Sequence, residues 1–253
     1  MSTFSRLISR IILPSICLLL LWSLGAFLVD SSLILPNVLE VFETLGTLLH
    51  TPIFYEHLLA TTIRSLSAFV QSLFISILLG TLCGISSFAE DFFSFPMAII
   101  KSAPVVSFIL LALFWFTTDE VPVFVSILMT MPVLTSAVTS GIHSVDRKLL
   151  DMAQVYQFSL YKKIRYVYIP SVLPFFFAGS ISAFGLSWKV VVAAEVLSLP
   201  KRAVGTALQT GKVHLETGEV FAVSIAVIVL SYVLETLFVL LIRKKQRKTH
   251  GNH

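Results

Sequence analysis

Long apolar stretches constrain this chain more than any other feature of its sequence. A helix needs about 20 mostly apolar residues to cross the hydrocarbon core of a bilayer, and several stretches here are that long and almost free of charge. Only 13% of the residues are charged, whereas soluble domains carry about 25%. We therefore predict an all-α membrane protein, with one membrane domain over residues 1–253 and six transmembrane helices at about 11–29, 65–88, 95–116, 121–142, 173–197 and 220–242.

The first apolar stretch begins after Arg6 and Arg10, as a secretory signal peptide also would. No small-x-small cleavage site follows and the stretch is long enough to cross a bilayer, so we predict a retained helix. The next segment, "LPNVLEVFETLGTLLH" (residues 35–50), repeats apolar residues at helical spacing, with Glu40 and Glu43 on the other side. This pattern predicts an amphipathic helix at the membrane surface.

The basic residues are distributed unequally between the two sides of the membrane. Six crossings place both termini on one side, and thirteen Lys and Arg residues, including Lys101, then lie on that side, against three on the other. Because cytoplasmic loops are enriched in Lys and Arg, we predict a multi-pass protein of the inner (cytoplasmic) membrane with both termini in the cytoplasm. The same bias accounts for the basic pI of about 9.1 without a nucleic-acid partner.

The polar segment 143–170 is long for a connection between two membrane helices. Its first part, "LLDMAQVYQFSLYKKI", repeats apolar residues at helical spacing. Either it is a solvated basic loop that follows the positive-inside rule, or it is an amphipathic helix whose apolar ridge needs a covering partner. The ridge would consist of Leu149, Leu150, Ala153, Val155, Tyr156 and Leu160.

This loop resembles the "EAA" motif of the integral-membrane subunits of binding-protein-dependent ABC importers. The motif runs Glu-Ala-Ala, three residues, Gly, nine residues and Ile-x-Leu-Pro. Residues 151–153 (Asp-Met-Ala), Gln157 and residues 167–170 (Val-Tyr-Ile-Pro) occupy these positions with the same spacing. Gln157 in place of Gly is the most consequential departure, because Gln adopts a positive φ less readily. We expect a tighter or differently angled turn after the helix.

Further segments extend the resemblance over most of the chain. "SVDRKLLDMAQ", "GLSWKVVVAAEVL" and "LPNVLEVFETL" are similar to the nitrate, sulfonate and taurine branch, which also includes importers of thiamine precursors. The resemblance implies a type I ABC importer-like permease for a small solute, such as nitrate, a sulfonate, taurine or a pyrimidine-type compound. It also implies a homodimer, two cytoplasmic ATP-binding subunits that hold ATP and Mg, an extracytoplasmic solute-binding protein, and no cofactor or catalysis in this chain.

The resemblance also assigns a role to the helix that begins the cytoplasmic loop. That helix would dock in a groove of the ATPase, and the two states would differ in their contacts with the membrane part. Lys162, Lys163 and Arg165 either pair with the ATPase or hold the loop at anionic headgroups. The residues expected to couple the permease to the ATPase are Leu150, Asp151, Met152, Ala153, Tyr156, Gln157, Phe158 and Pro170.

Ionisable residues inside the apolar stretches are a second group of candidates, because charges at membrane depth are costly and face a cavity or a partner. Lys189 and Glu195 are six residues apart and lie on different faces of one helix. Glu195 is either wet near the outer surface or has a structural or gating role, and Glu235 is a candidate partner of Lys189. Large aromatic residues nearby either pack or line the path. Candidates for the path or gate are Pro104, Phe108, Phe184, Trp188 and Glu195.

Other chemistries find little support. No His, Cys, Asp and Glu cluster has metal-ligand spacing. The stretch "GTALQTGKV" (residues 205–213) has five residues between its glycines and Val after Lys, whereas a phosphate loop needs four and Ser or Thr. A stand-alone secondary transporter would often show repeated halves and ionisable residues near mid-membrane, and an intramembrane enzyme would show a catalytic constellation. These two alternatives are weaker than the importer.

Overall fold

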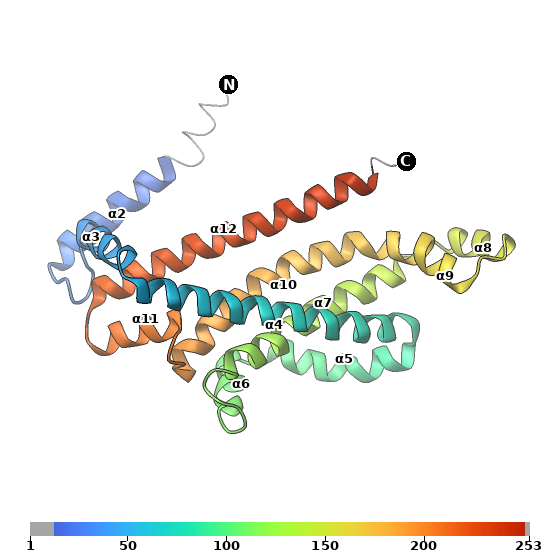
Figure 1. Cartoon of the computed structure of the whole chain (residues 1–253), viewed down its shortest axis with the longest axis horizontal. Coiled ribbons are helices and arrows are strands. Elements are labelled where there is room, and N and C mark those ends of the chain that lie inside the picture. The colour runs from blue at the N-terminus through green and yellow to red at the C-terminus, as the bar shows by residue number, and fades with distance from the viewer. Residues whose placement is uncertain (1–12, 251–253) are drawn as a thin grey trace.

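The computed structural model describes the backbone of residues 13–250 and the side chains of residues 13–244. No strand occurs in this part of the chain, so the all-α prediction is confirmed. The helices form an elongated bundle in which α8 and α9 lie at one end and α3 and α11 at the other (Figure 1). Their bounds are α2 Leu13–Val29, α3 Val38–Leu49, α4 Pro52–Ile85, α5 Ser87–Ser102, α6 Val105–Ala112, α7 Val121–His143, α8 Arg147–Val155, α9 Leu160–Lys163, a π-helical turn Ile164–Tyr168, α10 Ile169–Ser198, α11 Val204–Val213 and α12 Thr217–His250.

Within the described residues, four helical stretches are long and apolar enough to cross a membrane: α4, α7, the continuous α9–α10 stretch and α12. The pair α5 and α6 is bent by 98° and is either one broken span, which would make a fifth crossing, or a re-entrant loop. The first predicted span corresponds to α2, which has 17 residues and is shorter than the usual crossing length of about 20. The count of six therefore stays a prediction.

The bend between α5 and α6 lies at Pro104, inside the third predicted span. Pro lacks the N–H that would continue the helix, and the residue before it, Ala103, is extended with ψ 143°. Pro104 then caps α6, which turns away from α5. Residues 35–50, predicted as an amphipathic helix, contain α3, which is capped by Asn37.

Helix α7 is the centre of the bundle, and it packs most extensively against α4 and α10. Small residues allow this close approach. A Cβ added at Gly80 or Gly84 of α4 would lie 2.6 Å from Val138 or 2.7 Å from Ile142 of α7. One added at Gly179 of α10 would lie 2.4 Å from Ala137. The three helices therefore form a tightly packed core that the other helices surround.

Candidate functional site

The loop between α7 and α10 folds around a small apolar cluster of its own. Asp146 caps α8 by accepting a hydrogen bond from the Lys148 N–H at 2.9 Å. Ala153 is fully buried and packs with Val145 and Val167, which lie before and after the helix. Leu150, Phe158 and Tyr168 cover this cluster. The expectation that Ala153 lies on an exposed ridge is therefore wrong, because its side chain holds the loop together from inside.

An apolar surface is nevertheless present on the other side of α8. Leu149, Met152, Val155 and Tyr156 are all exposed there, and Val155 is the most exposed at 78%. We call these four residues the α8 ridge. Asp151 and Gln157 are also exposed, whereas Leu150 and Phe158 are half-buried. The coupling residues predicted from sequence thus divide into an outward group and an inward group.

The turn after α8 keeps the left-handed conformation that Gly would adopt most easily. Gln157 has φ 51°. The Phe158 N–H donates to the Ala153 carbonyl at 2.8 Å and the Gln157 N–H donates to the Gln154 carbonyl at 3.0 Å, which is the pattern of a Schellman motif. This conformation is less stable by about 1–2 kcal/mol for a residue with a Cβ, and Gln157 adopts it nevertheless. Pro170 lies in the first turn of α10, where a missing N–H is harmless.

At the opposite end of the bundle, Glu195 is fully buried. Its carboxylate accepts hydrogen bonds from Thr61 Oγ1 at 2.9 and 3.0 Å, from Arg64 at 3.0 Å and from the Gly205 N–H at 3.2 Å. A Cβ at position 205 would lie 2.5 Å from the Cβ of Glu195. Only Gly allows α11 to approach this carboxylate so closely. One alternative from the sequence was that water solvates Glu195 near the outer surface. The structure contradicts this alternative, because the side chain is fully buried.

Arg64 extends this network to the segment before α7. Its guanidinium also donates to Asp119 at 2.6 Å and to the Arg202 carbonyl at 2.7 Å. We call Thr61, Arg64, Asp119, Glu195 and Gly205 the Glu195 network. It joins α4, α10, α11 and the α6–α7 connection, and each of its charges has an opposite partner.

The other path candidates lie in packed or peripheral places. Phe184 and Trp188 are buried in apolar clusters, and Phe184 stacks on Phe238, so packing accounts for both. Phe108 is half-buried against the cluster around α6 and α7. Lys189 is exposed and no ion pair joins it to any described residue. Glu235 lies beside Gly185 instead.

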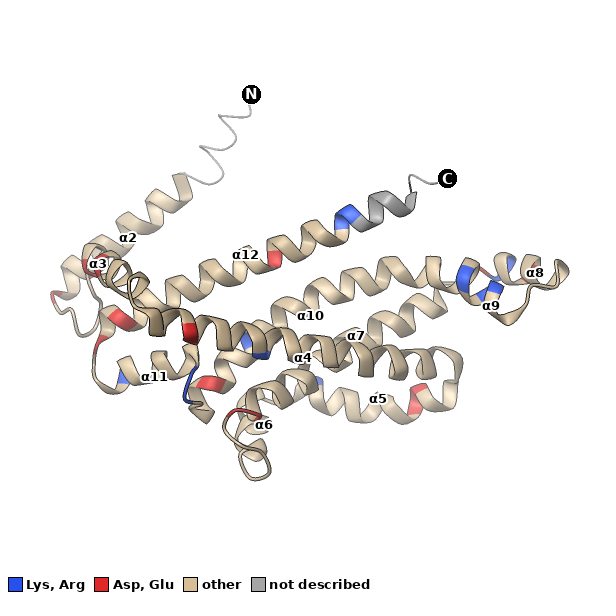
Figure 2. Ribbon diagram, viewed as in Figure 1, with Lys and Arg blue, Asp and Glu red and all other residues tan. Residues whose placement is uncertain are grey.

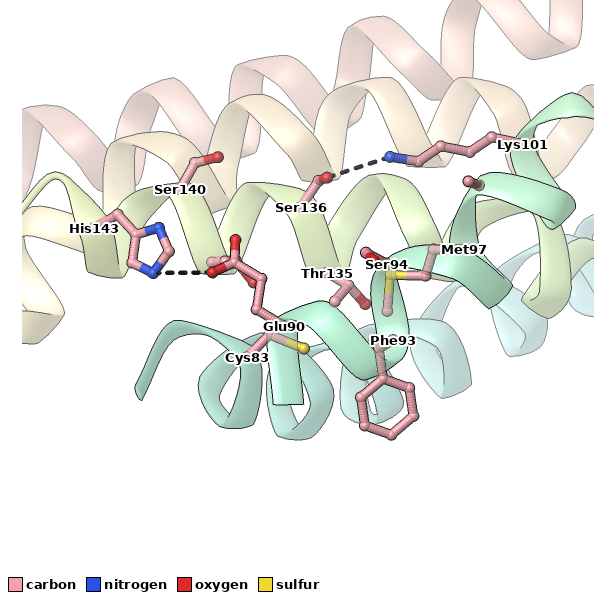
Figure 3. A pocket seen from close by; sticks show the side chains of 12 residues that line it. Cys83, Glu90, Phe93, Ser94, Met97, Lys101, Thr135, Ser136, Ser140 and His143 are labelled. Carbon is pink, nitrogen blue, oxygen red and sulfur yellow. Dashed lines mark hydrogen bonds and ion pairs between the residues drawn. The ribbon is translucent and has the colours of Figure 1, made fainter. Parts of the chain in front are cut away.

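A polar groove between α4, α5 and α7 was missed by the sequence analysis. Its volume is about 280 Å³, and Figure 3 shows Lys101 pointing toward Ser136 and His143 toward Glu90. Lys101 Nζ lies 3.3 Å from Ser136 Oγ, and His143 Nε2 lies 3.7 Å from Glu90 Oε2. The groove is lined by Cys83, Glu90, Phe93, Ser94, Met97, Ala98, Lys101, Thr135, Ser136, Thr139, Ser140 and His143.

Lys101 does not lie at the inner end of the bundle, where the charge count had placed it. It contacts α7 at Ser136, which is seven residues, or about 10 Å along the helix, before the end at His143. The sequence does contain a signal for this groove. The spacing of Ser136, Ser140 and His143 places three polar side chains on one face of an apolar helix.

The described residues contain no group of three His, Cys, Asp or Glu side chains that could hold a metal ion. The stretch 205–213 lies in helix α11 and its first glycine packs against Glu195, so it does not form a phosphate loop.

The family of the chain follows from comparison with known proteins. Residues 76–247 match the family described as "Binding-protein-dependent transport system inner membrane component". The chain belongs to this family. The resemblance seen in the loop is thereby confirmed: the chain is a permease subunit of an ABC importer, and separate subunits hydrolyse ATP. It is a transport protein of the membrane and not an enzyme.

Two curated relatives show how far the similarity extends. The chain is 25% identical over 245 residues to the putative aliphatic sulfonates transport permease protein SsuC of Bacillus subtilis (strain 168), covering 96% of this chain and 88% of that protein. It is 25% identical over 221 residues to the taurine transport system permease protein TauC of Escherichia coli (strain K12), covering 85% of this chain and 80% of that protein.

Solved structures support the same fold. A crystal structure of an amino acid ABC transporter with histidines contains a chain with TM-score 0.65 and 17% identity, covering 81% of this chain and 97% of that one. An inward-facing structure of the MetNI methionine ABC transporter gives TM-score 0.60 and 13% identity, covering 75% and 93%. The type I importer permease fold is thus confirmed.

Proposed function

We propose that this permease pairs with a second copy of itself and works with two cytoplasmic ATPase subunits and an extracytoplasmic solute-binding protein. The observation that carries this assembly is the α8 ridge, an exposed apolar surface on a loop whose own core is already filled by Ala153, Val145 and Val167. An apolar surface of this kind is typical of a helix that docks in a groove.

We further propose that the protein lies in the inner membrane, with the loop and both termini in the cytoplasm. Lys and Arg residues gather at the end of the bundle that holds α8 and α9 (Figure 2). The positive-inside rule makes this the cytoplasmic end. Lys162, Lys163 and Arg165 form no ion pair with another described residue, so they are free to meet an ATPase or anionic headgroups.

The loop is well placed to transmit a motion of the ATPase. It connects the end of α7 directly to the start of α10, and these two helices form the most extensively packed pair of the described chain. The cluster around Ala153 keeps α8 from yielding locally, because buried side chains at close packing resist displacement. A push on the α8 ridge is therefore passed to both central helices together.

For the solute, we propose a small organic sulfonate delivered by the binding protein. Relatives that cover most of this chain are named for aliphatic sulfonates and for taurine. Nitrate and pyrimidine-type solutes, which the resemblance also implies, have no counterpart among these names.

The substitution Val155→Asp tests the coupling role, with Gln154→Asp as a control that places the same side chain at an exposed polar position of α8. Burying Val contributes about 1.5–3 kcal/mol, and Asp would add an unpaired charge in the docked groove. We expect Val155→Asp to lose co-purification with the ATPase in detergent, and Gln154→Asp to keep it.

Two results would contradict the assembly. One is a Val155→Asp complex whose ATP hydrolysis is still stimulated by loaded binding protein. The other is uptake of solute into vesicles by the purified chain without ATP.

A further inference from the structure

The only exposed side chains of α7 are polar. Within its 23 residues, Ser136, Ser140 and His143 are the three classed as exposed. Their spacing of four and three residues places them on one face of the helix. A helix at membrane depth does not turn such a face to lipid, since intramembrane polar side chains face a water-filled cavity or a partner.

Lys101 of α5 projects onto this same face. Its ammonium group has one hydroxyl partner, Ser136, at 3.3 Å, and no carboxylate within ion-pair distance in the described part of the chain. Lys101 is exposed in the described chain, but a charge at membrane depth is costly unless an anion or water compensates it. At one end of the groove, away from Glu90, Lys101 thus supplies a positive charge without a carboxylate beside it (Figure 3).

One hydroxyl group at the wall of the groove has no partner. Thr135 lines the groove and is only 2% exposed, and its Oγ1 has no hydrogen-bond partner among the described residues, although buried hydroxyl groups nearly always find one. Buried polar atoms of Ser180, Trp188 and Ser198 are also unpartnered. Lys101 and the exposed polar face of α7 therefore carry the evidence for a ligand, and Thr135 adds a polar wall.

The remaining titratable groups of the groove do not balance Lys101. Glu90 pairs with His143 at 3.7 Å, toward the far end of α7. Glu90 precedes Lys101 by eleven residues on α5, which is about 16 Å along the helix. Cys83 is a buried thiol. The end of the groove at Lys101 thus favours a negatively charged group, and the Glu90 carboxylate lies at the other end beside His143.

We propose that this groove is the part of the translocation path that receives the anionic group of the solute. Lys101 holds the anion by a charge-assisted hydrogen bond, and the exposed hydroxyl groups of Ser136 and Ser140 donate to its remaining oxygens. Such bonds are about twice as strong as neutral ones, and the open side of the groove lets the solute leave. This inference rests on the proposed function as an importer of small organic anions.

The first experiment uses the assembled complex in proteoliposomes, with ethanesulfonate as the solute. Lys101→Gln is expected to lower ATP-driven uptake by about tenfold or more, while ATP hydrolysis by the complex continues. Lys101→Arg is expected to restore most of the uptake, because it restores the charge. Undiminished uptake by the Lys101→Gln complex would overturn the inference.

The second experiment does not depend on the solute. Ser136→Cys is treated in the complex with anionic 2-sulfonatoethyl methanethiosulfonate and with the cationic trimethylammonioethyl reagent, beside the parent chain that keeps Cys17 and Cys83. We expect the anionic reagent to react faster, and Lys101→Gln to remove this preference. No preference, or no reaction because a second copy covers the groove, would overturn the inference.

The two experiments separate the inference from the proposed function. If the parent complex fails to take up ethanesulfonate but Ser136→Cys shows the anionic preference, the proposed solute is wrong and the anion-binding groove stands. If uptake is normal but independent of Lys101, the importer stands and the groove is not its path.

Discussion

The Glu195 network and the polar groove both place charged side chains in the membrane part of this permease, and they are built in opposite ways. In the Glu195 network, a fully buried carboxylate is bound by Thr61, Arg64 and the Gly205 N–H. In the polar groove, Lys101 is exposed and has only the Ser136 hydroxyl as a partner. One site is complete within the chain, whereas in the other the Lys101 ammonium group has no carboxylate partner among the described residues.

We interpret the Glu195 network as a structural site and the polar groove as a site for the solute. A buried charge that already has all its partners holds helices in register, since removing one partner leaves another charge unpaired. A charge with too few partners gains most from a ligand that supplies the missing ones. Substitutions in the Glu195 network should therefore change stability, whereas substitutions at Lys101 should change uptake.

The largest expected effect is that of Glu195→Ala. Arg64 keeps Asp119 and the Arg202 carbonyl as partners, but the Thr61 hydroxyl and the Gly205 N–H lose their buried acceptor. Each buried group left unsatisfied costs about 1–3 kcal/mol, and the lost side-chain volume adds a cavity. We expect poor recovery of folded protein in detergent and a much lower unfolding temperature. Lys101→Ala is the matched control, with little change in either. Equal stability of the two variants would contradict the comparison.

The next largest effect is expected at Gly205, where an added methyl group would lie 2.5 Å from the Glu195 Cβ and 2.5 Å from the Val196 nitrogen. Gly205→Ala should destabilise the protein by about 1–3 kcal/mol, because backbone atoms cannot move aside easily. Gly46→Ala, where nothing lies within 4 Å, should instead stabilise helix α3 by about 0.5–1 kcal/mol. Thermal unfolding should show a lower unfolding temperature for Gly205→Ala and a higher one for Gly46→Ala.

A pair of identical chemical changes sharpens the contrast further. Thr61 and Thr135 are both buried, at 0% and 2% exposure, and Val removes the hydroxyl from each at almost constant volume. Thr61→Val should lower the stability by about 1–3 kcal/mol. Glu195 would lose a hydrogen-bond donor, and the Val204 N–H would lose its acceptor. Thr135→Val should leave stability unchanged or higher, because its hydroxyl has no partner. A similar loss in both would show that the groove hydroxyl is structurally bonded.

The smallest effect is expected outside both places, at Lys162. This residue is exposed and forms no ion pair with another described side chain. Lys162→Ala should leave the unfolding temperature and uptake unchanged if Lys162 only contacts headgroups. A large loss of ATPase binding would instead assign Lys162 to the ATPase contact.

The sequence was sufficient for the helices but not for the directions of their side chains. Apolar length predicted stretches that overlap α4, α7, α10 and α12 in the structure. In α8, however, apolar residues occur on two faces, and periodicity does not say which face the chain covers itself. Val145 and Val167, which precede and follow α8 in the chain, pack on Ala153, so the inward face could be recognised only in three dimensions.

The Glu195 network illustrates a second limit. The partners of Glu195 on α4, Thr61 and Arg64, lie 134 and 131 residues away in the sequence, and no local pattern connects them. Lys101 was misplaced for a related reason: a charge count treats it as a residue at a helix end, whereas the bend at Pro104 keeps it beside the middle of the bundle. Long-range packing decides both environments.

The central claim is that charge pairing distinguishes the structural site from the transport site, and one paired measurement tests it directly. Glu195→Gln and Lys101→Gln each remove one charge at almost constant size. For the complex that carries each variant, the unfolding temperature and the ATP-driven uptake of ethanesulfonate are measured in the same preparation. We predict that Glu195→Gln lowers the unfolding temperature, and that Lys101→Gln leaves it unchanged while uptake falls by about tenfold or more. The reverse pattern, with Lys101→Gln unfolding early and Glu195→Gln stable but inactive, would contradict the account.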